Sequence, residues 1–162
     1  MNIIVAVDEN WAIGYKGELL ISIKEDLQNF KRLTLEQNVV MGEITYESLP
    51  KRPLPNRTNI IITKDKNYKA INTIILHDVK DVVAYAEMSD KETFIIGGAQ
   101  IYDIFIPYYK KAYITKIHHK FNADRHIKNF IDEKWKLIQQ SVMFKTDDGF
   151  NYQFLCYEKI LY

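Results

Sequence analysis

Asp26 is a carboxylic acid in a segment whose apolar residues predict one face of a helix. Ile23, Leu27 and Phe30 follow the spacing of a helical stripe, and Asp26 occupies the i+3 position of that stripe. Burying a carboxylate is costly and raises its pKa, so an acid at such a position suits proton chemistry. The alternative is a first-turn acid stabilised by the helix dipole, but Glu25 already fills that role. We interpret Asp26 as a functional acid.

Arg57 is the last residue of a turn that contains two prolines, Pro53 and Pro55. Proline fixes its own backbone angle, so this turn is stiff and holds the arginine in a defined direction. A guanidinium on a rigid support is suited to bind a carboxylate through two parallel hydrogen bonds. A solvated basic turn is the alternative, and these residues alone leave both interpretations open.

Two glycine turns stand between an apolar run and a segment with helical spacing. Gly97-Gly98 comes after Thr93–Ile96 and before Ala99–Tyr109, and Gly42 in the same way precedes Thr45–Leu49. Such junctions point helix N–H groups at the carboxyl edge of a parallel sheet, where phosphates bind. Such a turn alone is more often an ordinary tight turn, whereas two that converge on one pyrophosphate favour a dinucleotide site.

A further glycine-punctuated segment, Trp11–Gly17, follows the first apolar run of the chain. We expect a loop here. It is either a mobile lid over a site at the strand ends or a plain surface loop.

The elements that must position these residues are short strands and amphipathic helices. Apolar, β-branched runs predict strands covered on both faces, as in a parallel sheet, at Ile3–Val7, Val39–Met41, Asn59–Thr63, Thr73–Leu76, Thr93–Ile96 and Tyr113–Ile117. Ser22 and Glu25 form a capping-box pattern that predicts a helix beginning near Ile23. Further helical stripes consist of Val79, Val82, Val83 and Ala86, and of Ile101, Ile104 and Phe105, the second being closed by Pro107.

The end of the chain has the alternation of an antiparallel hairpin. Phe150, Tyr152 and Phe154 alternate with polar residues, and Asp147-Asp148-Gly149 supplies a turn back to Leu137–Phe144. With no internal repeat and no linker-like shift in composition, the sequence predicts a single domain over residues 1–162. Its fold class is α/β in three layers, with a mostly parallel central sheet and a C-terminal antiparallel hairpin.

The composition argues against several classes of function. The 162 residues hold 22 Lys and Arg against 21 Asp and Glu, so nothing favours a nucleic-acid or membrane partner. The apolar runs are too short for a membrane span, and the first lacks the features of a signal peptide. The one cysteine, Cys156, fits a buried strand and cannot form an internal disulfide. We expect a cytoplasmic protein without a metal site.

Together these residues resemble the dihydrofolate reductase family over essentially the whole chain, from Ile3 to Tyr157. The matching segments, in order, are Ile13-Gly14, Asp26-Leu27-x-x-Phe30-Lys31, Val40-Met41-Gly42-x-x-Thr45-Tyr46-Glu47-Ser48-Leu49, Arg52-Pro53-Leu54-Pro55-Asn56-Arg57, Ile95-Ile96-Gly97-Gly98-Ala99-Gln100-Ile101-Tyr102 and Tyr113-Ile114-Thr115. The resemblance implies NADPH-dependent reduction of 7,8-dihydrofolate to 5,6,7,8-tetrahydrofolate by hydride transfer to the pteridine. It also implies antifolates as ligands, and we expect a monomer.

The resemblance further implies individual roles. Asp26 matches the acid that binds the pteridine and promotes protonation of its N5, and Thr115 matches the threonine that hydrogen-bonds to that acid. Arg57 matches the arginine that grips the α-carboxylate of the folate glutamate. The other expected substrate contacts are Val5, Ala6, Leu27, Phe30, Leu49, Leu54 and Ile96. The expected cofactor contacts are Ala6, Ile13, Gly14, Leu19, Gly42, Ile44, Thr45, Thr63, Lys64, Ile96, Gly97, Gly98, Ala99, Gln100, Ile101 and Tyr102.

Three departures from the family pattern bear on specificity. Leu19-Leu20-Ile21 stands where the family usually has Leu-Pro-Trp, which alters the polarity near the acid and the fit of inhibitors. Glu43 stands where a basic residue commonly meets cofactor phosphates, so we expect a narrower preference for NADPH over NADH. Lys64 and His77 are the expected compensating contacts. The family's Asp-Thr-x-Phe-Pro-like segment is replaced by Asp124–Lys128, which bears on the lid.

Two other functions are compatible with parts of this pattern. A related reductase of the riboflavin-pathway type shares the architecture, but the Asp26–Thr115 pair and Arg57 argue against it. A nucleotide-binding module without enzymatic activity would follow if Ile21 and Glu43 weakened the site. An assay with dihydrofolate and NADPH separates the three.

Overall fold

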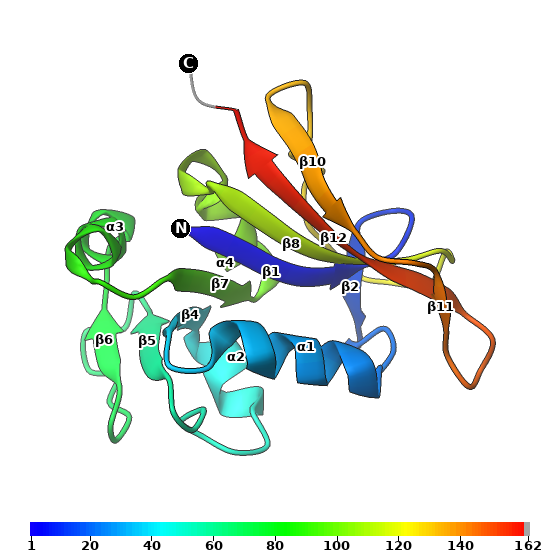
Figure 1. Ribbon diagram of the computed structural model, residues 1–162. Coiled ribbons are helices and arrows are strands. Elements are labelled where there is room, and N and C mark those ends of the chain that lie inside the picture. Colours follow the sequence, from blue (N-terminus) through cyan, green and yellow to red (C-terminus); the bar gives the residue numbers. More distant parts are fainter. Residues whose placement is uncertain (161–162) are drawn as a thin grey trace.

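A twisted central sheet runs through the computed structural model, which describes residues 1–160 (Figure 1). Within these residues nine strands pair in the order β10-β12-β8-β1-β7-β4-β5-β6, with β11 added to β12. Leu161 and Tyr162, which the prediction of one domain over residues 1–162 included, lie outside the described residues.

The strands from β8 to β6 in this order form the parallel part of the sheet. Their bounds are β1 Asn2–Val7, β4 Asn38–Gly42, β5 Thr58–Ile62, β6 Ile74–Leu76, β7 Thr93–Gly97 and β8 Lys111–Ile117. Each coincides with a predicted strand to within two residues. The parallel sheet expected from the apolar, β-branched runs is therefore confirmed.

The predicted antiparallel end of the sheet is also confirmed. It consists of β10 (Trp135–Gln140), β11 (Phe144–Lys145) and β12 (Asn151–Lys159), and β12 runs antiparallel to β8. The return strand, predicted as Leu137–Phe144, is in fact two strands. The interruption lies where Ser141 binds Phe154 through both its backbone N–H and its side-chain oxygen.

Helices cover both faces of the sheet, as the three-layer prediction requires (Figure 1). Their bounds are α1 Lys24–Thr34, α2 Glu43–Ser48, α3 Val79–Met88 and α4 Ala99–Ile104. Alternate strand residues point to opposite faces. One core cluster, against α3 and α4, includes Ile3, Val5, Val40, Ile60, Val82 and Tyr102. A second, against α2, consists of Val39, Met41, Tyr46 and Ile61.

The predicted start of a helix near Ile23 is confirmed by α1, which begins at Lys24, but its predicted cap and the predicted extent of a second helix are wrong for local reasons. Helix α1 takes Ile23 as its N-cap and has no side-chain cap hydrogen bond, because Ile23 is anchored in a buried cluster with Ile117 and Tyr152. The capping box of Ser22 therefore does not form. The helix predicted over Ala99–Tyr109 is divided into α4 and a 3₁₀ turn, Ile106–Tyr108. The break precedes a proline, which has no N–H to continue the α-helix.

The segment Trp11–Gly17, expected to be a loop, contains strand β2 (Ala12–Tyr15). This strand pairs with β3 (Glu18–Leu19) and with β9 (Arg125–His126), making a small separate sheet. Its pairing with β9 depends on a segment more than a hundred residues away, so the local sequence gave no sign of it.

Candidate active site

Asp26 and Thr115 are brought together from a helix and a strand far apart in sequence. Asp26 lies in the first turn of α1, and Thr115 lies on β8, beside Ala6 of β1. The Thr115 hydroxyl donates a hydrogen bond of 2.5 Å to Asp26 Oδ1. This bond aims the carboxylate at the carboxyl edge of the parallel sheet.

The surroundings of Asp26 favour its protonated form. Burial raises the pKa of the Asp26 carboxyl above its ordinary value, and the hydrogen bond from Thr115 offsets only part of that effect. The same desolvated setting raises the pKa of Tyr102, with the Asp26 charge as a smaller contribution, while its hydroxyl donates to the Ile4 carbonyl. An acid held in this way can supply or retain a proton closer to neutral pH than a free aspartate.

Helix α1 carries Asp26 at its start and contacts Arg57 at its end. Arg57 Nη1 donates to the hydroxyl of Thr34, the last residue of the helix, at 3.4 Å, and its Nε donates to the Pro55 carbonyl at 2.8 Å. Burial lowers the pKa of Arg57. Asp26 and Thr34 are separated by roughly 12 Å along the helix axis. A ligand with a polar ring at one end and a carboxylate at the other therefore fits along α1.

The apolar stripe of α1 is more open than the sequence predicts. Leu27 is 53% exposed and Phe30 only half-buried, whereas a buried stripe was expected. Among the other expected contacts, Leu19 is 69% and Ile44 71% exposed. Large apolar side chains left open at a site with a buried acid are typical of a surface that a ligand covers.

The expected substrate contacts occupy the edge of the sheet and the segments that flank it. Val5 and Ala6 lie at the end of β1, and Ile96 lies in β7. Leu49 and Leu54 are half-buried against the core cluster of α2, together with Ile96. Ile96 and the segments that carry Leu49 and Leu54 thus place apolar side chains on the same face of the sheet as α2.

The two predicted glycine junctions meet in space. Strands β4 and β7 are parallel neighbours, with Met41 opposite Gly97. A side chain at Gly98 would stand 3.4 Å from Thr45 Oγ1, and one at Gly42 would stand 3.2 Å from Ile101. Gly97 has a φ of +126°, a conformation that favours glycine. The two glycine junctions therefore lie side by side, as predicted.

The expected phosphate contacts follow along the same edge. Because β7, β4, β5 and β6 are adjacent and parallel, their carboxyl ends place Gly98, Glu43, Lys64 and His77 in that order. Thr63, predicted inside the strand, directly follows β5 and accepts a hydrogen bond from His77 Nδ1 on its carbonyl oxygen at 2.7 Å. Lys64 is exposed. Glu43, the acidic candidate, and Lys64, the basic one, therefore follow the carboxyl ends of two neighbouring strands.

The remaining expected cofactor contacts divide between two places. Ile13 and Gly14 lie in β2, outside the main sheet. Ala99, Gln100, Ile101 and Tyr102 form the start of α4, directly after the glycine pair. The first of these places follows the carboxyl end of β1, and the second follows the carboxyl end of β7.

Two buried polar residues near the candidate site, Asn59 at the amino end of β5 and Asp8 directly after β1, were missed by the sequence reasoning. Asn59 donates to the carbonyls of Leu54 and Arg57 and accepts from the Leu54 N–H, so it braces the turn that carries Arg57. Asp8 accepts three backbone hydrogen bonds beyond the end of β1. A signal existed for Asn59, a polar residue at the start of an apolar strand, and for Asp8, a charge directly after one.

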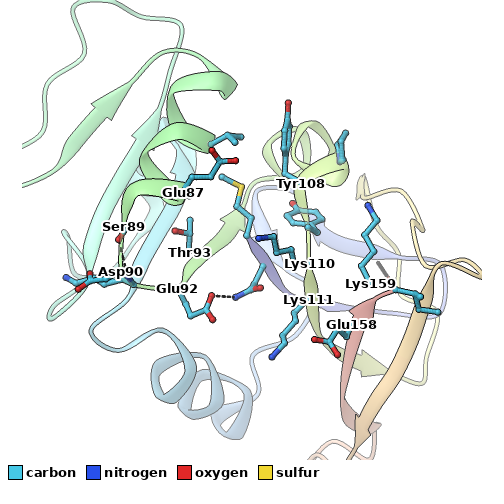
Figure 2. Close-up of a pocket in the computed structure, with 18 of the residues that line it drawn as sticks. Glu87, Ser89, Asp90, Glu92, Thr93, Tyr108, Lys110, Lys111, Glu158 and Lys159 are labelled. Carbon is cyan, nitrogen blue, oxygen red and sulfur yellow. Dashed lines mark hydrogen bonds between the residues drawn. The ribbon is translucent and has the colours of Figure 1, made fainter. Parts of the chain in front are cut away.

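A groove of about 960 Å³ lies elsewhere on the molecule (Figure 2). Its lining includes Asn2, Thr93 and Lys111, at the amino ends of β1, β7 and β8, and therefore at the opposite edge of the sheet. None of the predicted site residues lines it. Figure 2 shows lysine and glutamate side chains around its rim. The groove is separate from the candidate active site.

Two further expectations concern absences. Among residues 1–160, no cluster of three or more His, Cys, Asp or Glu side chains is arranged to hold a metal ion. Within the same residues, no helix is long and apolar enough to cross a membrane.

Comparisons with known proteins agree with this geometry. A family model described as dihydrofolate reductase matches residues 1–159. The chain is 38% identical over 160 residues to a dihydrofolate reductase of Bacillus subtilis, covering 98% of this chain and 94% of that one. It is 35% identical to a dihydrofolate reductase of Staphylococcus haemolyticus, and this match covers 99% of this chain and 96% of that one. A solved structure of dihydrofolate reductase from Enterococcus faecalis, complexed with NADP(H) and RAB-propyl, has a TM-score of 0.88 at 31% identity, and the match covers 98% of this chain and 95% of that one.

Proposed function

The chain belongs to the dihydrofolate reductase family, and from that premise we propose that it reduces 7,8-dihydrofolate to 5,6,7,8-tetrahydrofolate with NADPH. The observation that carries the proposal is the placement of Asp26 and Arg57 at the two ends of α1. A reduced folate has a pteridine ring at one end and a glutamate carboxylate at the other, so its polar groups match these residues.

Asp26 is the one acid assigned to the reaction. Its Oδ1 is held by Thr115, and its raised pKa keeps a proton available as the pH approaches neutrality. It binds the pteridine and promotes protonation at N5. The proposed substrate contacts around it are Val5, Ala6, Leu27, Phe30, Leu49, Leu54, Arg57, Ile96 and Thr115.

The residues at the glycine junctions fit a dinucleotide. A Cβ at Gly42 would be crowded by Ile101 at 3.2 Å, and one at Gly98 would stand in van der Waals contact with Thr45 Oγ1 at 3.4 Å. With glycine at both positions the backbone can approach a pyrophosphate. NADPH, when bound, supplies the hydride that reduces the pteridine. The proposed cofactor contacts are Ala6, Ile13, Gly14, Leu19, Gly42, Ile44, Thr45, Thr63, Lys64, Ile96, Gly97, Gly98, Ala99, Gln100, Ile101 and Tyr102.

The setting proposed for the enzyme is a cytoplasmic monomer that binds dihydrofolate and antifolates and no nucleic acid. The near balance of 22 basic and 21 acidic residues supports the last point. The single cysteine, Cys156, is buried in β12 and supports a reducing compartment.

The test is oxidation of NADPH by the purified chain, with dihydrofolate as substrate and identification of the product. We expect tetrahydrofolate in equal amount to the NADPH consumed. A pyrimidine intermediate of riboflavin synthesis serves as the competing substrate. Turnover of that compound, with dihydrofolate left unchanged, would overturn the proposal in favour of the related reductase.

A further inference from the structure

Asp8 is a fully buried carboxylate that the proposed reaction does not use. It is 0% exposed and directly follows β1. Its Oδ1 accepts hydrogen bonds from the backbone N–H groups of Asn10 and Ala12, at 2.8 and 2.9 Å. Its Oδ2 accepts one from the N–H of Phe121, at 2.9 Å. Both oxygens are therefore occupied by backbone donors.

These bonds join two segments that flank the candidate active site. The bonds to Oδ1 close the turn between β1 and β2, and the bond to Oδ2 reaches the segment that follows β8. A backbone hydrogen bond from Glu9 N to the His119 carbonyl lies next to it. Asp8 thus ties the first residue of β2 to a segment that lies more than a hundred residues later in the chain.

Strand β2 is held differently at its other end. There the Asp124 N–H donates to the Gly14 carbonyl at 3.1 Å, and the Lys16 N–H donates to Asp124 Oδ2 at 3.0 Å. Asp124 is exposed, whereas Asp8 is buried. Bonds that compete with water are weaker than buried, charge-assisted ones. The start of β2 is therefore held more strongly than its other end. Figure 1 shows this start near the end of β1.

We propose that Asp8 is a positioning residue for the cofactor: it fixes β2 so that Ile13 and Gly14 are held in place before NADPH binds. Preorganisation of a binding segment lowers the entropy lost on association. This inference rests on the proposed function, because Ile13 and Gly14 are cofactor contacts only if the chain binds NADPH. The folate end of the site depends on α1 and Arg57. The side-chain hydrogen bonds of Asp8 go to Asn10, Ala12 and Phe121 and to neither of these, and its link to α1 is only the packing of Phe121 in the cluster of Ile23.

The variant Asp8→Asn tests the carboxylate with little change in volume. An amide can still accept from Asn10 and Ala12 through its oxygen, but its NH₂ group then faces the N–H of Phe121 and the link between segments is lost. Asp8→Ser is a second variant, since a serine hydroxyl can close the turn but cannot reach Phe121. Glu9→Gln is the matched control, because it removes a charge from the adjacent, exposed residue.

The measurements are dissociation constants for NADPH and, separately, for folate without NADPH, well below each variant's melting temperature. We expect both Asp8 variants to weaken NADPH by roughly tenfold and folate by less than twofold. Glu9→Gln should change neither. Equal weakening of the two ligands, unchanged NADPH affinity, or failure of both variants to fold would overturn the positioning role. Failure of the wild-type chain to bind NADPH would instead overturn the proposed function, and this inference with it.

Discussion

The hydroxyl of Thr115 on β8 donates a 2.5 Å hydrogen bond to the carboxylate of Asp26 on α1. The bond thereby fixes the first turn of α1, where Asp26 lies, to the central strands of the sheet. The bond favours the ionised form of Asp26, while burial favours the protonated form more strongly. The balance between these two effects determines at what pH the acid can serve a substrate.

Removal of the Thr115 hydroxyl should therefore move the pH dependence of the reaction. In Thr115→Val the pKa of Asp26 rises further, because the bond that lowers it is gone. We expect the fall in kcat/KM with rising pH to occur at a higher pH than in wild type, alongside a loss of substrate affinity. Thr115→Ser, which keeps a hydroxyl, should retain the wild-type midpoint. An unmoved midpoint in Thr115→Val would mean that another group controls the profile.

Asp26 should reduce the stability of the folded protein at neutral pH. Its pKa is above the ordinary value of 3.8 in the folded state, so its ionisation costs folding free energy. Below pH 3.8 the acid is protonated in both states and the cost is absent. It grows as the pH rises through the raised folded pKa. Asp26→Asn should have a higher free energy of unfolding than wild type near pH 7, and this advantage should vanish in acid. Urea denaturation at both pH values measures it.

Arg57→Lys should raise the KM for dihydrofolate, because a point charge cannot reproduce a two-pronged grip on a carboxylate. The expected penalty is roughly 2 kcal/mol of binding free energy. A pteridine substrate without the glutamate tail should be reduced equally well by both proteins. Arg52→Lys is the matched control in the same turn, since Arg52 instead pairs with Glu47 at 2.6 Å. Equal damage to the tail-less substrate would show that Arg57 is structural.

Glu43 and Lys64 should oppose one another in the choice of cofactor. They follow neighbouring strands, β4 and β5, at the edge proposed to bind phosphates. Glu43→Arg should tighten NADPH relative to NADH, and Lys64→Ala should reduce the preference for NADPH. Each charge at such a partly exposed place is worth about 1 kcal/mol, so several-fold shifts are expected at low salt. Lys66→Ala, also exposed, is the control. An unchanged NADPH-to-NADH ratio in Glu43→Arg would place that side chain away from the phosphates.

Features that depend on a local pattern of residues could be predicted from the sequence. Apolar β-branched runs marked the parallel strands, and the odd position of Asp26 marked the acid, because both signals lie within a few residues. The predicted burial of the α1 stripe was wrong, since Leu27 is exposed; we propose that the substrate covers it, and a substrate is not encoded in the chain's own pattern. The roles of Asp8 and β2 were not predictable in this way. Their partners, Phe121 and β9, are brought near only by the completed sheet.

The pH dependence of hydride transfer in Asp26→Asn shows whether Asp26 sustains the reduction through its proton. Single-turnover rates with dihydrofolate and NADPH would be measured from about pH 5 to about pH 8 for wild type and variant. We expect the variant to be slower than wild type by a factor of roughly a hundred or more near neutrality. It should recover partly in acid, where the substrate is already protonated in solution. A variant with near wild-type rates across the whole range would contradict the claim.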